Sequence, residues 1–90
     1  MGKLEVFQLP GLSLWFNSHD HLAPHFHAEG DDWEVRVFFL REPPEVEIKW
    51  GRGPKGKARQ SLLAAAREHR PGLLIEWQTK VVVRDPGPEK

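Results

Sequence analysis

The chain contains no cysteine among its 90 residues. A disulfide framework and a thiolate metal site are therefore excluded, and any bound zinc or iron would need imidazole and carboxylate ligands. No apolar run approaches the roughly 18 residues that span a bilayer, and residues 1–10 lack the basic and then apolar pattern of a signal peptide. We therefore expect a soluble, cytoplasmic protein with no membrane partner.

The net charge is zero, but acidic and basic residues are unevenly distributed along the chain. Residues 1–48 contain nine acids and three bases, whereas residues 49–67 contain six bases and no acid. Such a basic segment is typical of a solvated helix face, here opposite the protein's own acidic half, or of a surface that binds nucleic acid or an acidic partner. The candidate residues for nucleic-acid or partner binding are Lys49, Arg52, Lys55, Lys57 and Arg59.

A chain of this length suits a single small domain, which we expect over residues 1–84, followed by a flexible tail over residues 85–90 with two prolines and a glycine. Apolar and aromatic content and two-residue alternation predict strands over residues 12–16, 25–29, 33–40 and 45–50. The second and third form a hairpin, in which Trp33, Val35, Val37 and Phe39 share one face.

Residues 57–69 have helical spacing, and Pro71 is well placed to begin a second helical segment with Leu73, Leu74 and Trp77 on its apolar stripe. Residues 72–84 either stay helical or end in a short strand over residues 80–83. The predicted fold class is α+β: a small antiparallel sheet of about four strands, packed by one or two C-terminal helices. All four tryptophans are expected in the core.

Four of the five histidines fall within residues 19–27. On an extended segment His25, His27 and Glu29 share one face, while Phe26 and Ala28 share the other. We expect the two imidazoles to project into solvent while Phe26 anchors the core. Two imidazoles at this spacing can converge on one ion, so the candidate ligands of a divalent metal (zinc, manganese or nickel) are Asp20, His21, His25, His27 and Glu29. An exposed pair that binds no physiological metal is the alternative.

Glycines at positions 51, 53 and 56 follow the last predicted strand, in the manner of a phosphate-binding loop. Pro54 removes one backbone amide that such a loop would use, and too little chain remains for a nucleotide-binding unit. This spacing alone therefore does not predict a nucleotide site.

The chain resembles a known family in its residues 20–28 (DHLAPHFHA), in Gly11 before the first predicted strand, and in His69-Arg70 leading to Glu76-Trp77. It is similar to the small prokaryotic domain-of-unknown-function family 4160, whose signature is a His, two prolines and then His-Phe-His-Ala. The chain departs from that pattern at Ala23, in the extra His19 and at Gly72. The resemblance marks His21, Pro24, His25, Phe26 and His27, and implies membership of a two-gene module of the toxin and antitoxin type.

Two functions remain open. The favoured one is a non-catalytic interaction module, whose hairpin and basic helix dock a partner protein encoded nearby and whose histidine face is the recognition surface. The alternative is a small metal-dependent or general acid-base RNase or phosphodiesterase, in which His25 and His27 are the catalytic candidates and the basic segment attracts RNA. An open strand edge would also allow a homodimer.

Overall fold

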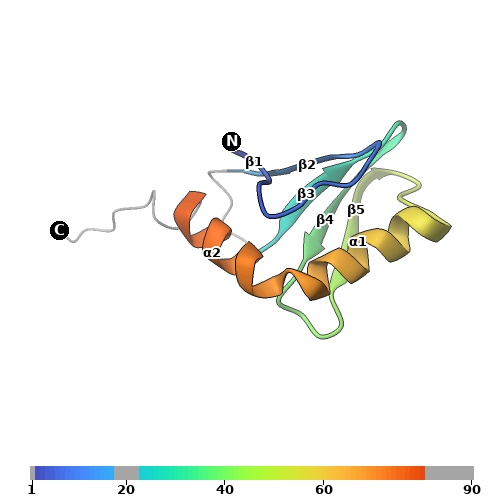
Figure 1. The fold of residues 1–90 in the computed structure, drawn as a ribbon. Helices are drawn as coiled ribbons and strands as arrows, with labels where there is room; N and C mark the ends of the chain where they lie inside the picture. The colour runs from blue at the N-terminus through green and yellow to red at the C-terminus, as the bar shows by residue number, and fades with distance from the viewer. Residues whose placement is uncertain (1, 18–22, 81–90) are drawn as a thin grey trace.

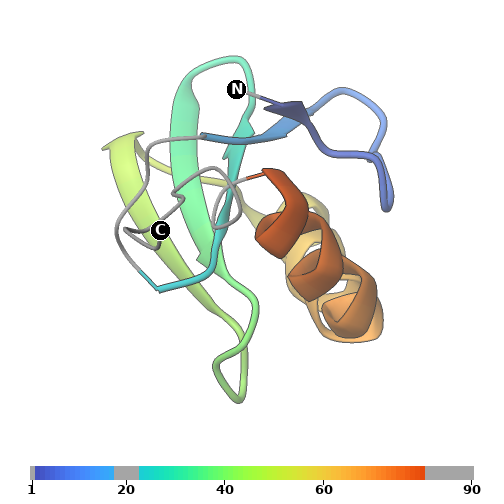
Figure 2. The same ribbon diagram turned by 90° about the vertical axis from the view of Figure 1, so that its left-hand side faces the viewer.

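The computed structural model describes residues 2–17 and 23–80. Its elements, in chain order, are β1 (Gly2–Lys3), β2 (Ser13–Phe16), β3 (Phe26–Glu29), β4 (Trp33–Phe38), β5 (Glu45–Gly51), α1 (Gly56–Glu68) and α2 (Arg70–Lys80). The strands form one antiparallel sheet in the order β1-β2-β3-β4-β5. Both helices lie on one face of this sheet (Figures 1 and 2). The expected α+β fold is confirmed, with the two-residue β1 as an additional strand.

The predicted second helical segment is confirmed as α2, which ends at Lys80. The question of a strand over residues 80–83 and the expected tail over residues 85–90 concern positions that, apart from Lys80, lie outside the described residues. Within residues 2–17 and 23–80, no helix has the length and apolar character needed to cross a membrane.

The core lies between the sheet and the helices. The β3–β4 hairpin sets Phe26 opposite Val37 and Ala28 opposite Val35, so both pairs contribute to the same buried layer. Strand alternation brings these side chains to one face because successive side chains point to opposite sides of a strand. The helices close the layer with Leu62, Ala66, Leu73 and Trp77. The four residues predicted to share a face of the hairpin, Trp33, Val35, Val37 and Phe39, all belong to this core.

Strand β5 departs from the regular alternation that its sequence predicts. The ladder pairs Ile48 with Val35 and Trp50 with Glu34, so Lys49 is an extra residue and forms a bulge. Trp50 is consequently 46% exposed, and its indole Nε1–H donates to Glu34 Oε1 at 3.2 Å. The expectation that every tryptophan lies in the core is therefore wrong for Trp50, because a bulge changes the side of the sheet to which the following side chain points. It is also wrong for Trp15, which is half-buried on the face of the sheet opposite the core.

Helix α2 forms hydrogen bonds with two segments that are distant from it in the sequence, the N-terminal segment and the β4–β5 connection. The buried carboxylate of Glu76 accepts the backbone N–H of Glu5 at 2.8 Å and that of Val6 at 3.0 Å. It also accepts a hydrogen bond from Lys80 Nζ at 2.7 Å. Burial disfavours the charged form of Lys80, but its hydrogen bonds to Glu76 and Glu5 outweigh this and raise the pKa of Lys80.

At the start of the same helix, Arg70 Nε donates to the carbonyl oxygen of Phe39 at 2.9 Å, and its guanidinium also pairs with Glu42. Hydrogen bonds from Arg70 and Arg67 lower the pKa of the Glu42 carboxyl. Helix α2 thus ties the N-terminal segment and the β4–β5 connection to the body of the domain.

The Glu76 interactions predict a measurable loss of stability in Glu76→Gln. The amide keeps the size of the side chain but has one accepting oxygen for two backbone donors, and it ends the ion pair with Lys80. We expect urea denaturation to show a free energy of unfolding lower by about 1–3 kcal/mol. Glu68→Gln, an exposed change on α1, is the matched control. Equal stability of the two variants would contradict this role of Glu76.

Candidate functional site

The imidazoles of His25 and His27 are buried, with exposed fractions of 0% and 1%. His27 stacks on Trp15, with ring centroids 5.3 Å apart and an interplanar angle of 12°. His25 packs against Phe38 at 5.1 Å and Trp77 at 5.5 Å between centroids. The expectation that both imidazoles project into solvent is therefore wrong.

The face of β3 that carries His27 is covered because of the way the strands pair. Strand β3 has a neighbouring strand on each side, and the register places Trp15 of β2 directly opposite His27. A cross-strand neighbour at that distance covers a facing imidazole with its indole. The alternation itself is as predicted, since Phe26 and Ala28 lie in the core on the opposite face.

The two imidazoles have distinct polar surroundings. His25 Nδ1 lies 2.7 Å from the carbonyl oxygen of Ala23, which only accepts, so this ring nitrogen donates. His27 Nε2 lies 3.4 Å from Asn17 Nδ2, and its Nδ1 lies 3.7 Å from Glu34 Oε2. These contacts fix the ring orientations, as expected of imidazoles that serve the packing of the sheet.

Glu34 connects His27 to β5, although no sequence motif marks it. Besides lying close to His27, its carboxylate pairs with Lys49 Nζ at 3.2 Å and accepts the indole N–H of Trp50 at 3.2 Å. The bulge at Lys49 brings both of these β5 residues to one partner on β4. Only the pairing register reveals this arrangement, because the residues are far apart in the sequence.

The expected metal ligands are not gathered in the described part of the chain. Asp20 and His21 lie outside the described residues. Among residues 2–17 and 23–80, no group of three His, Cys, Asp or Glu side chains is arranged to hold a metal ion. His25, His27 and Glu29 therefore do not form such a group by themselves, and Glu29 is exposed at the end of β3.

The bases of residues 49–67 fall into two groups, those with and those without an ion pair among the described residues. Lys49 pairs with Glu34 at 3.2 Å and Arg67 pairs with Glu42 at 3.0 Å, so these two bases do face the acidic half of the chain. The other bases of the segment form no ion pair with any residue in the described ranges; we name them the basic cluster: Arg52, Lys55, Lys57 and Arg59.

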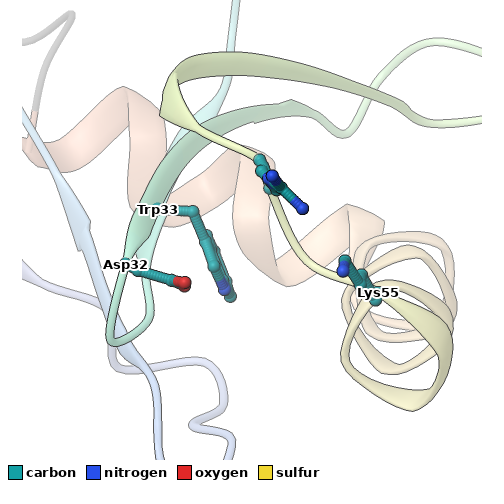
Figure 3. Close-up of a pocket in the computed structure, with 5 residues that line it drawn as sticks. Asp32, Trp33 and Lys55 are labelled. Atoms are coloured by element: carbon teal, nitrogen blue, oxygen red, sulfur yellow. The ribbon is translucent and has the colours of Figure 1, made fainter.

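The basic cluster adjoins a cavity of about 350 Å³. Its lining comes from the β3–β4 turn and from the loop between β5 and α1, and consists of Asp32, Trp33, Arg52, Gly53 and Lys55 (Figure 3). Gly51 permits the close approach of the two segments: its φ is +78°, and a Cβ there would lie 2.1 Å from the carbonyl oxygen of Asp32. No other residue fits this position without moving the turn.

A second surface is the edge strand β5. Ile48 is 49% exposed and Trp50 is 46% exposed, so two large apolar side chains face solvent on one short strand. The charged side chains of β5 are all paired within the chain, as Glu45 with Arg41, Glu47 with Arg36, and Lys49 with Glu34. The strand therefore presents one exposed apolar side chain on each face of the sheet, because Ile48 lies opposite Val35 and Trp50 lies opposite Glu34, and its charges are already compensated.

Comparison with known proteins gives one family. A model described as Domain of unknown function (DUF4160) matches residues 11–78, which span β2 to α2 and include both the buried imidazoles and the basic cluster. No curated protein and no solved structure matches the chain.

Burial of His27 predicts that His27→Ala acts on stability. Removing an imidazole stacked under Trp15 leaves a cavity in a close-packed layer, and we expect the free energy of unfolding to fall by about 2–4 kcal/mol. Chemical denaturation followed by tryptophan fluorescence measures this loss. Gln60→Ala, an exposed change on α1, is the control and should leave the midpoint unchanged. A His27→Ala midpoint equal to that of the parent protein would contradict the structural role.

Proposed function

The chain belongs to the DUF4160 family, whose description names no activity, and we propose from its own side chains that it is a non-catalytic module that binds a partner protein. The docking surface is the free edge of β5. The partner is the protein encoded beside it, as the resemblance to two-gene modules of the toxin and antitoxin type implies.

The observation that carries this proposal is the exposure of Ile48 and Trp50 on an edge strand. Figure 2 shows β5 at one edge of the sheet. An edge strand offers backbone N–H and C=O groups to a further strand, and alternate side chains then provide specificity. A partner segment in extended conformation would pair with β5 and cover the two apolar side chains.

The internal ion pairs of β5 define the chemistry of that segment. Glu45, Glu47 and Lys49 already have partners within the chain, so a charged segment would have to compete with existing pairs. Surface pairs of this kind contribute little individually, but a charged competitor also loses hydration. The fitting partner is therefore an apolar strand, rich in β-branched or aromatic side chains.

The imidazoles take no part in this proposal. The histidine face that we expected to recognise the partner is covered, because His25 and His27 lie beneath aromatic side chains. The same burial leaves the RNase alternative without a supporting observation among the described residues, since a general acid or base has to reach the substrate.

The proposal predicts a complex that depends on the β5 edge. The protein is mixed with the product of the adjacent gene, and the dissociation constant is measured by isothermal titration calorimetry. Ile48→Lys should weaken binding at least about tenfold, because it places a charge in an apolar contact. The matched control is Ile75→Lys, since Ile75 is 64% exposed on α2 and lies away from the edge.

Three outcomes would contradict the proposal. The first is the absence of any complex, and the second is an equal loss of affinity in Ile48→Lys and Ile75→Lys. The third is a homodimer of the protein alone that Ile48→Lys dissociates, because the edge would then be occupied by a second copy. Analytical ultracentrifugation of the parent protein and both variants distinguishes the third outcome from the others.

A further inference from the structure

We propose that the cavity between the β3–β4 turn and the start of α1 binds a phosphate group. This site adjoins the edge surface, since the side chain of Ile48 packs against Gly53 in the cavity lining, but it does not depend on the proposed partner. Its lining residues Arg52 and Lys55 supply the positive charge, and the cavity of about 350 Å³ has room for a phosphate and part of the molecule that carries it.

Acidic partners are unevenly distributed among the bases near the cavity. Neighbouring bases that precede or follow the basic cluster have acidic partners: Lys49 with Glu34, and Arg67 and Arg70 with Glu42. The four bases of the cluster have none within the described residues. Concentrated uncompensated charge of one sign attracts a ligand of the other sign. An anion is therefore the ligand that this end of the molecule fits.

Two bases of the cluster lie in one cavity. Arg52 and Lys55 come from the same short loop, and both line the cavity with Asp32 and Trp33. Figure 3 shows the indole of Trp33 between Asp32 and Lys55. A guanidinium binds two phosphate oxygens through its fork of N–H donors, and an ammonium adds a compact charge. The two together carry two positive charges toward a bound phosphate, of which Asp32 in the same lining offsets one.

The loop that carries Arg52 and Lys55 packs closely against its neighbours. Gly51 and Gly53 have φ values of +78° and +83°, a conformation that glycine adopts most readily. A Cβ on Gly53 would lie 2.9 Å from Ile48 Cδ1, and one on Gly51 would meet the β3–β4 turn. Because Pro54 has no N–H, the side chains rather than a series of loop amides provide the binding groups.

Asp32 opposes the two bases in the same lining and makes no ion pair with either of them. Its carboxylate repels a bound phosphate and thereby limits the affinity of the site. Removing charge should therefore change the phosphate affinity in opposite directions: neutralising Asp32 should tighten binding, and neutralising Arg52 or Lys55 should weaken it. A diffuse positive surface would not show this dependence on individual residues.

The experiment titrates the full chain with pyrophosphate at constant ionic strength and follows amide and indole shifts by NMR. We expect saturable shifts centred on Gly53 and on the indole N–H of Trp33. Lys55→Gln and Arg52→Gln should each raise the dissociation constant about fivefold, and Asp32→Asn should lower it by a similar factor. Lys3→Gln, the same charge change at an exposed lysine of β1, is the control and should change nothing.

The proposal is overturned if shifts fail to saturate up to about 10 mM pyrophosphate, well above a weak millimolar dissociation constant. It is also overturned if Lys3→Gln weakens binding as much as Lys55→Gln, since the attraction would then be to net charge alone. Once pyrophosphate binds as expected, competition distinguishes the natural source of the phosphate. Displacement by a short single-stranded RNA assigns it to a nucleic acid strand, and failure of that RNA to compete assigns it to a small phosphorylated compound.

Discussion

The structure depends on the burial of β3 on both of its faces. Phe26 and Ala28 fill the layer beneath the helices, while His27 lies under Trp15 on the other face. His25, just before the strand, packs against Phe38 and against Trp77 of α2. A domain of this size buries a limited fraction of its surface, so a central strand that packs on two sides contributes much of its stability. His25 and His27 thus serve the packing of the sheet, and Glu34 connects His27 to Lys49 of β5.

The two surfaces proposed to bind a partner or a ligand lie at the margins of the sheet. The β5 edge and the basic cluster adjoin one another in the chain, because Arg52 directly follows the end of β5 at Gly51. They differ in chemistry: the edge is apolar with compensated charges, whereas the cluster carries charge that the described residues leave uncompensated. A partner strand and a phosphate group would therefore occupy neighbouring but separate surfaces.

Periodicity predicted the elements of this fold well, because the alternation in residues 33–39 and the helical spacing of residues 57–69 reflect contacts with one core. Alternation assigns side chains to two faces but does not reveal what covers the second, so the burial of His25 and His27 was missed. The bulge that exposes Trp50 and the carboxylates of Glu34 and Glu76 depend on register and on long-range contacts. The division of the basic segment likewise required knowing which acids lie nearby in space.

The most direct test of the central claim is the accessibility of the imidazoles. Diethylpyrocarbonate modifies exposed, unprotonated histidines, and mass spectrometry assigns each modified site. The account predicts that His25 and His27 stay unmodified in the native protein, that the half-buried His69 reacts, and that all three react in urea. Native-state modification of His25 and His27 as rapid as in urea would contradict the account, because β3 would then be covered on only one face.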